Sequence, residues 1–542
     1  MAVAIMRAGA MLAPLFLAGA GIAADGPVAS VPIGDRVIDL TPPVPRPGTR
    51  HCTVTLFDRR EFRGEAPLAL DYRPPADCPG PWRKVVLEAD FDVTAGLQYD
   101  RTADLTIGGA TLFVGTTMEP GKDYAPHWHV ERDVTDLAAV LRQPADGAAT
   151  LVNFLDGDHT GRVSWGARLV FYAGDAPAGH QVVVPVTAGF VDLSSREPTV
   201  SRTLTLPRNM TGLQMDLFAI GQQRDEFWFD CIPPGFARPN PFPAAPCTPF
   251  REVEVRIDGQ LAAIHAVQPV IFTGGINPAL WRRAPGLHAL NLPSARLDLT
   301  PFAGVLNDGR PHDVTLAMPA VGTLFRLSGT LIATVDPMRP VVPGALVASR
   351  LSPAMVATRQ TRPGTQPDRT GTLVTTARRS GYAEGYVETS RGRTTTRVAY
   401  DLDMQVIATR DDGRYDKWYD ARHSTTVTTR GGRSRTRRID DHDVLTIVMP
   451  VDPPRHGVKY GTQITQTKER AVSDEAGRRN SALAMTTFAP TSSVFTAPRE
   501  TPNRVTVTSH VRDARGRCRR TGAVVADDSV ARSERTACPS GR

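Results

Sequence analysis

The sequence lacks the short motifs that mark several large enzyme classes. It contains no G-x-S-x-G turn of the kind that presents a serine nucleophile. It contains neither G-x-x-x-x-G-K-[ST] nor G-x-G-x-x-G, the glycine-rich loops that bind nucleotide phosphates. None of its cysteines is in a C-x-x-C pair, the spacing of redox and zinc sites. These absences leave carboxylates as the main candidates for catalysis.

Long hydrophobic runs are also scarce, and the one at the N-terminus is too short to cross a bilayer. An apolar run from Met11 to Ile22 follows Arg7 and precedes Ala24, whereas a span needs about 20 apolar residues. This pattern is typical of a secretory signal peptide. We therefore expect cleavage of residues 1–24, a secreted or periplasmic protein, and no membrane association afterwards.

Cysteines are few, and an exported chain favours their pairing in disulfides. The six cysteines fall into three local couples, so we expect the pairs Cys52 with Cys78, Cys231 with Cys247, and Cys518 with Cys538. Proximity only favours this connectivity, and buried free thiols are the alternative.

The composition is that of an ordinary globular chain, with 41% hydrophobic and 22% charged residues. At 542 residues the chain is too long for one core, so we expect two to four domains. The net charge is +7. Many of the arginines alternate with threonine along expected strands and match no nucleic-acid motif, so we expect no nucleic-acid partner.

Short alternating runs separated by turn residues dominate the chain, and only residues 132–141 look helical, for a turn or two. The fold class is therefore all-β, with two adjacent antiparallel jelly-roll or β-sandwich domains followed by a third β-rich domain. The expected divisions are a Pro-rich leader or linker at 25–48, jelly rolls at 49–175 and 198–338, a β-rich domain at 340–510, and a loose Arg-rich tail with a Cys pair at 511–542.

One expected strand, residues 97–107, carries a charge on its apolar face. Arg101 lies on the side of the apolar residues, where a guanidinium is costly unless a carboxylate or a bound polar ligand meets it. Asp100 beside it points to the opposite face. This Asp-Arg pair is a candidate functional site.

Other carboxylates lie where strands meet turns, namely Glu119, Asp156, Asp158, Asp225 and Glu226. Paired carboxylates can divide acid and base roles when burial raises one pKa and a nearby arginine lowers the other. Residues 227–229 place aromatic rings beside Glu226, as in proteins that stack sugars. For each acid the alternative is a solvated loop or capping group, and for each tryptophan it is core packing.

A histidine pair offers the strongest metal signal. His127, His129 and Glu131 would share one face of a strand, and Gly121 precedes them at the spacing of the first half of a cupin motif. The cupin glutamate is missing, because Asp133 stands near its position, and no matching later histidine occurs. A solvated strand face is the better interpretation, and we expect neither a metal nor a cofactor.

The order of several unusual strings resembles the peptide N-glycanase A family of plants and microbes. "DEFW", "TGGINPALWR", "DLTPF" and "LNDGRPH" occur in collinear order within roughly residues 50 to 336. A more distant resemblance to bacterial peptide N-glycanase F implies two side-by-side jelly rolls with the active site between them. The implied reaction is hydrolysis of the amide that joins a glycan to an asparagine side chain, which yields a glycosylamine and converts Asn to Asp.

The resemblance also implies roles for individual residues. The acid of a W-D-R motif falls on Asp100, here after Tyr99, and its arginine is Arg101. The acid of an A-E-W motif falls on Glu226, here after Asp225. We expect Asp100 to activate water, Arg101 to hold a carboxylate or sugar oxygen, and Glu226 to stabilise the tetrahedral intermediate or protonate the leaving glycosylamine.

A third acid of the glycanase F family has no exact counterpart, although Asn153 and Asp156 lie near its place. The resemblance puts Trp281 and Arg283 on the glycan side, with Arg282 equally placed. The expected substrate-binding residues are Arg101, Glu119, Asp156, Trp228, Trp281 and Arg283.

The expected partner is an N-linked glycopeptide or glycoprotein, bound by a monomer with an acidic pH optimum. Two alternatives remain open. A glycoside hydrolase also uses two carboxylates, and a noncatalytic glycan-binding or adhesion protein can be built on the same folds.

Overall fold

The computed structural model describes residues 31–175, 180–232, 248–363, 371–411, 414–450, 461–489, 503–526 and 529–535. Strands dominate these residues, and the helices are single turns or short 3-10 segments. The expected signal peptide lies outside the described residues. Among those described, no helix has the length and apolar character needed to cross a membrane.

The first domain is a jelly roll of two four-stranded sheets. Its strands follow the orders β2-β9-β4-β7 and β3-β8-β5-β6. Successive strands alternate between the two sheets except at the β5–β6 hairpin, which is the arrangement of a jelly roll. The strands are β2 (His51–Phe62), β3 (Leu68–Tyr72), β4 (Trp82–Val93), β5 (Thr102–Ile107), β6 (Ala110–Thr116), β7 (His127–Asp133), β8 (Ala145–Leu151) and β9 (Val163–Ala173).

The second domain repeats this topology, with the orders β10-β18-β13-β16 and β12-β17-β14-β15 and with β11 also paired to β18. The expectation of two jelly rolls is therefore confirmed by strand order. The strands are β10 (Gln181–Pro185), β11 (Val191–Leu193), β12 (Thr199–Leu204), β13 (Met210–Gln222), β14 (Glu252–Ile257), β15 (Gln260–Ala266), β16 (Ala295–Asp298), β17 (His312–Ala317) and β18 (Leu324–Val335).

Described residues from 344 onward, together with β1, form one antiparallel sheet of 12 strands, the C-terminal sheet. Apart from β20, which pairs only with β21, and from β1, neighbouring strands follow one another in a meander. The strands are β1 (Val31–Pro32), β19 (Gly344–Arg350), β20 (Met355–Pro363), β21 (Gly371–Thr389), β22 (Gly392–Asp411), β23 (Arg414–Arg430), β24 (Arg435–Pro450), β25 (Thr462–Asp474), β26 (Gly477–Ala489), β27 (Arg504–Arg512), β28 (Cys518–Ala526) and β29 (Ser529–Arg535).

Two expectations about the ends of the chain are wrong. The described residues of 511–542 do not form a loose tail, because β28 and β29 extend the sheet. Residues 31–48, the described part of the expected leader or linker, are not a free linker, since β1 pairs with β29 and Ile33 and Ile38 are 1% and 2% exposed in the core. Prolines in the N-terminal segment and arginines in the C-terminal one obscured the few apolar residues that face the interior.

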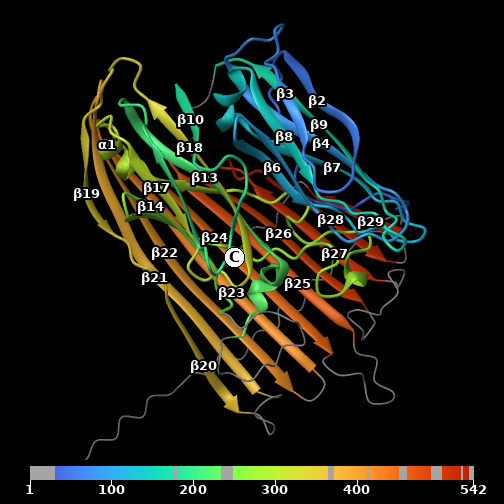
Figure 1. Cartoon of the computed structure of the whole chain (residues 1–542). Helices are drawn as coiled ribbons and strands as arrows, with labels where there is room; N and C mark the ends of the chain where they lie inside the picture. The colour runs from blue at the N-terminus through green and yellow to red at the C-terminus, as the bar shows by residue number, and fades with distance from the viewer. Residues whose placement is uncertain are drawn as a thin grey trace, which may run out of the picture.

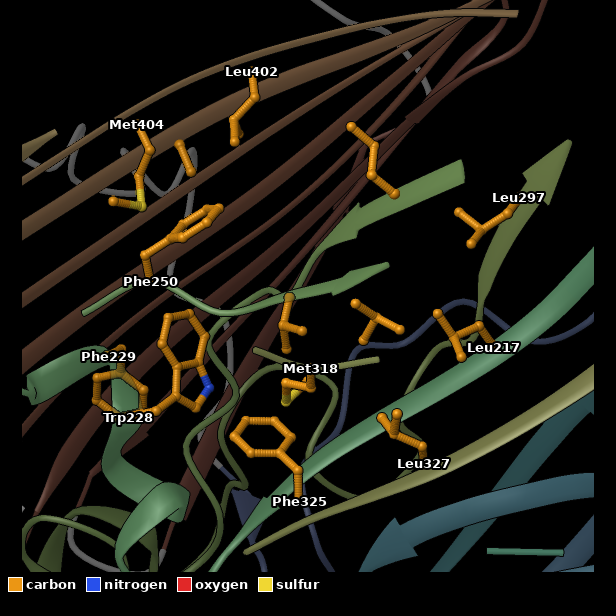
Figure 2. Packing of buried hydrophobic residues seen from close by; sticks show 14 of the residues in the cluster. Leu217, Trp228, Phe229, Phe250, Leu297, Met318, Phe325, Leu327, Leu402 and Met404 are labelled. Atoms are coloured by element: carbon orange, nitrogen blue, oxygen red, sulfur yellow. The ribbon is translucent and has the colours of Figure 1, made fainter. Parts of the chain in front are cut away.

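The two jelly rolls lie side by side over the C-terminal sheet, whose long strands run from orange to red in Figure 1. The second jelly roll and the sheet share one continuous hydrophobic cluster. Figure 2 shows part of it, with Trp228 and Phe229 lying below Phe250 and with Leu402 and Met404 projecting from the sheet. A smaller cluster containing Val114, Phe218, Ile220, Phe272 and Leu292 joins residues of the two jelly rolls.

The one or two helical turns expected at 132–141 are present as a pair of 3-10 turns, η1 (Thr135–Leu137) and η2 (Val140–Arg142). One cysteine pairing needs correction. The Cys52–Cys78 disulfide is absent, because both residues are free thiols. They are nevertheless neighbours, and burial and a hydrogen bond with Cys78 raise the pKa of Cys52 to about 12.

The other two cysteine couples lie partly outside the described residues. Cys231 and Cys518 are disulfide-bonded. Their expected partners, Cys247 and Cys538, are not among the described residues, so these two pairings stay predictions.

Candidate active site

Asp100 lies in a loop rather than in the expected strand, because β5 begins only at Thr102. The expected alternation fails in this loop: Tyr99 is 50% exposed, whereas Gln98 is fully buried. The Gln98 amide holds the loop by donating to the carbonyl oxygens of Phe154 and Gly161 at 3.0 and 3.2 Å. A buried, hydrogen-bonded amide therefore fixes the backbone two residues before the partly buried Asp100.

The pairing of β5 with β6 brings Glu119 close to Asp100. Thr102 pairs with Thr116 at the end of the ladder. Beyond it, Thr117 Oγ1 accepts from the Arg101 backbone N–H at 2.8 Å, and the Thr117 N–H donates to the Arg101 carbonyl at 2.9 Å. Glu119 therefore follows the end of β6, and Asp100 precedes the start of β5, so the two acids lie on neighbouring segments.

The third acid, Glu226, comes from the second jelly roll. It lies in η3 (Gln223–Asp230), which directly follows β13. The chain turns so sharply there that a Cβ at Gly221 would overlap the Asp225 carbonyl oxygen. Gln222, the last residue of β13, donates to Thr102 Oγ1 at 3.3 Å, which ties this turn to the start of β5.

Asp225 anchors the start of η3 and faces away from solvent, with 1% exposure. Its Oδ2 accepts three backbone N–H groups of residues 322–324 at 3.0, 2.5 and 2.9 Å. Its Oδ1 accepts from Arg251 Nη2 at 2.8 Å. Asp225 is therefore a structural carboxylate, and of this neighbouring pair only Glu226 has its carboxyl group available to the site.

Trp228 and Trp281 are both buried, and their expected contact with the glycan stays a prediction. Trp228 is 3% exposed and belongs to the core between η3 and the C-terminal sheet (Figure 2). Trp281 is 1% exposed and donates its Nε1–H to the Gly275 carbonyl at 2.7 Å. Core packing describes the position of Trp228, whereas Trp281 also lines a small cavity that includes Glu119.

The Gly275 loop that Trp281 braces closes over Glu119. Gly274 has φ +90°, and a Cβ there would overlap the Glu119 carboxylate. The loop continues into η4 (Pro278–Trp281), which Asn277 caps by accepting from the Ala279 N–H at 3.0 Å. Two buried side chains thus hold the glycine backbone against the acid.

The carboxyl groups of Asp100, Glu119 and Glu226 interact electrostatically. Burial, then the charges of Glu226 and Glu119, raise the pKa of Asp100 well above its ordinary value, and Arg101 opposes this shift. Burial and the charge of Glu119 raise the pKa of Glu226 to about 7. Such a group retains protons near neutral pH, as acid-base catalysis requires.

The expected arginines occupy different positions. Arg101 Nη2 donates to Gln98 Oε1 at 2.7 Å, so the partner of the guanidinium here is the buried Gln98 amide. Arg283 is 5% exposed, donates to the Gly34 carbonyl and lies 4.1 Å from the centroid of the Tyr124 ring. Arg283 therefore secures the N-terminal segment, whereas Arg282 lines a small cavity that includes Glu119.

Asp156 lies in an exposed turn. Its Oδ1 accepts the backbone N–H of His159 at 2.6 Å and that of Asp158 at 2.8 Å. These bonds and the His159 side chain lower the pKa of Asp156 to about 2. The His159 ring lies 4.9 Å from that of Tyr99, so Asp156 supports the neighbourhood of the Asp100 loop. Asn153 is fully buried and donates to the Phe62 carbonyl.

The histidine pair belongs to a different part of the first jelly roll from the Asp100 loop. His127 and His129 project from the exposed face of β7, and His129 Nδ1 bonds Asp90 Oδ1 at 2.7 Å. Within the described ranges, no group of three or more His, Cys, Asp or Glu side chains has an arrangement suited to a metal ion.

Sequence reasoning undervalued Glu119 and missed Gln98 and Gly274. Glu119 could have been placed by counting outward from the turn at Gly108 and Gly109, because hairpin pairing then sets it opposite the Asp100 loop. Gln98 and Gly274 gave no comparable signal, since their roles depend on contacts with residues distant in sequence.

More than half of the chain matches the model of a known protein family. Residues 42–331 match the family described as Peptide N-acetyl-beta-D-glucosaminyl asparaginase amidase A. A relative from Prunus dulcis, named Peptide-N4-(N-acetyl-beta-glucosaminyl)asparagine amidase A, is 26% identical over 392 residues, with 67% of each chain covered.

Solved structures give fainter likenesses. PNGase F from Flavobacterium meningosepticum, titled a glycosylasparaginase, is 12% identical, with 53% of this chain and 96% of that chain covered and a TM-score of 0.37. The structure titled PNGF-II is 13% identical, with 53% and 66% covered and a TM-score of 0.38. The strand order itself, described above, defines the two jelly rolls.

Proposed function

Because the chain belongs to the Peptide N-acetyl-beta-D-glucosaminyl asparaginase amidase A family, we propose that it hydrolyses the amide bond between an N-linked glycan and its asparagine. The products are a glycosylamine and a peptide in which Asn has become Asp. The observation that carries this proposal is the meeting of Asp100, Glu119 and Glu226, from two jelly rolls, where mutual repulsion and burial raise the pKa values of Asp100 and Glu226.

Amide hydrolysis needs a base for the attacking water and an acid for the departing nitrogen. We assign the base to Asp100, because the charge of Arg101 beside it opposes the rise in pKa that burial, Glu226 and Glu119 cause. We assign the acid to Glu226, whose pKa is raised to about 7 by burial and by Glu119, with no cation opposing the shift. The two groups titrate as a pair, and the reactive form is the pair that holds one proton.

Glu119 has a different role in this proposal. Its charge keeps a proton on the Asp100–Glu226 pair, since it raises the pKa of both members. Gly274 lets the backbone lie directly against it. Arg282, on the wall of the same small cavity, is better placed than Arg283 for contact with the substrate.

We also propose that the substrate is an N-linked glycopeptide or glycoprotein and that the enzyme acts as a monomer. The N-terminal pattern at 1–24 supports export, so the mature protein is secreted or periplasmic.

The test is product analysis on a defined N-glycopeptide. The proposal predicts a bare peptide that is heavier by about 1 Da than its asparagine form, because an amide becomes an acid. A peptide that keeps one N-acetylglucosamine on Asn would indicate a glycoside hydrolase. Retention of the glycopeptide without turnover would indicate a binding protein.

A further inference from the structure

The C-terminal sheet contacts the segment that carries Glu226. Asp230, at the end of η3, accepts hydrogen bonds from Lys417 Nζ at 2.8 Å and from the Tyr415 hydroxyl at 2.5 Å. Asp230 and Lys417 are each 1% exposed, and Tyr415 is fully buried. An ion pair from β23 thus holds the end of η3 out of contact with water.

Apolar contacts accompany this ion pair. The Trp228 ring meets that of Tyr419, also from β23, edge to face with centroids 6.3 Å apart. Trp228 and Phe229 belong to the same buried cluster as Leu402 and Met404 of β22 (Figure 2). Apolar packing favours contact between η3 and the sheet, whereas the charged hydrogen bonds are directional and set the orientation of η3.

The same sheet holds the other wall of the site. The Leu280 carbonyl accepts from Thr487 Oγ1 and from Asn503 Nδ2, both at 2.9 Å. Gln466 Oε1 accepts from the Leu287 N–H at 3.2 Å. Residues of β25, of β26 and of the segment before β27 therefore secure the loop that continues from Gly274.

We infer that the C-terminal sheet positions the active site, and that Lys417 orients Glu226 by holding Asp230. The inference rests on the proposed function, since it concerns the placement of the proposed acid. A buried carboxylate without its cation is strongly unfavourable, so loss of Lys417 forces η3 to move or admit water. Misplacement by about 1 Å can cost roughly a hundredfold in rate. Lys417 is therefore a positioning residue.

The full-length chain offers a matched control. Lys468 also makes a 2.8 Å bond to an aspartate, Asp443, and is likewise largely buried. Both members of this pair belong to the C-terminal sheet, in β25 and β24. The substitutions Lys417→Met and Lys468→Met therefore remove equivalent ion pairs, of which only one touches η3.

The experiment measures kcat, KM and the pH profile of both variants and the wild type on one N-glycopeptide. We expect Lys417→Met to lower kcat at least tenfold with KM changed less than about twofold, and to shift the alkaline limb to lower pH as water reaches Glu226. Lys468→Met should retain the kcat and pH profile of the wild type.

Equal effects in both variants, or an unchanged kcat and pH profile in Lys417→Met, would overturn the inference. If Lys417→Met does not fold, Tyr415→Phe decides, because it removes the 2.5 Å bond to Asp230 with little change in packing volume. The expected loss of kcat is then smaller but in the same direction. An inactive wild type contradicts the proposed function, whereas an active wild type with unaffected variants contradicts only the inference.

Discussion

The backbone of Gly274 lies against the carboxylate of Glu119, and a Cβ at position 274 would overlap that carboxylate. The residue also has φ +90°, a conformation that L side chains rarely adopt. Gly274→Ala should therefore displace Glu119 and lower kcat/KM by about a hundredfold. Steady-state kinetics on an N-glycopeptide measures this effect.

The control is Gly48→Ala, because a Cβ at position 48 meets no atom within 4 Å. This variant should match the wild type. Wild-type kcat/KM in Gly274→Ala would show that Glu119 does not need its present position.

Removal of the paired acids is expected to abolish most activity. Asp100→Asn and Glu226→Gln each remove one proton-transferring group, worth about 10² to 10⁴-fold in rate. Asp158→Asn changes an exposed acid in a surface turn and should have little effect. Initial rates of glycan release provide the comparison, and wild-type rates in either of the first two variants would move the chemistry to other residues.

The pH profile should be bell-shaped. The pKa of Glu226 is raised to about 7 and that of Asp100 lies well above its ordinary value. Because the reactive pair holds one proton, activity should rise above the ordinary carboxylate range of about pH 4 and fall once the pair is fully deprotonated, near or above about pH 7. A pH series of kcat/KM tests this, and an optimum above about pH 8 without an acid limb would disagree.

The raised pKa of Glu226 also means that its ionised carboxylate destabilises the folded protein. Its value is about 7 in the folded protein and 4.5 as an ordinary carboxyl. Below the lower value both states hold the proton and no penalty exists, whereas stability is lost as the pH rises through the higher value. Glu226→Gln should therefore stabilise the protein by up to roughly 3 kcal/mol at pH 8 and by little at pH 4.

Thermal or denaturant unfolding of the wild type and Glu226→Gln at both pH values measures this difference. The neighbouring Asp225 cannot serve as the control position, because its carboxylate is buried against Arg251 and has a structural role. Asp158→Asn is the control again. Equal unfolding free energies of Glu226→Gln and the wild type at pH 8 would mean that the carboxylate is not destabilised by its surroundings.

The sequence could predict the jelly rolls because their strands alternate regularly between turn residues. It could place Asp100 and Glu226 only through short motifs shared with a family. It could not show whether Trp228 lies in the core or on the surface, since a tryptophan close to an acid in sequence is compatible with either position. The position of Trp228 depends on Tyr419, which lies in another domain.

The burial of Lys417 in the C-terminal sheet could not be predicted from the sequence either. Lys417 lies between Tyr415 and Tyr419 on one face of β23, and a lysine in this position predicts a half-polar strand face. Its burial becomes intelligible only when Asp230 is known to meet it. Polar residues that are buried by long-range pairing escape periodicity, because the partner rather than the pattern makes their burial tolerable.

Mass spectrometry of the peptide product after reaction in ¹⁸O-labelled water is the sharpest test of the proposed reaction. If Asp100 activates water against the amide carbon, the wild type yields a peptide whose new Asp carboxyl carries the label, and Asp100→Asn yields almost none. An unlabelled peptide that retains its Asn after glycan release would contradict the proposal, because water would then have attacked the sugar instead. Full labelling by Asp100→Asn would contradict the role of Asp100.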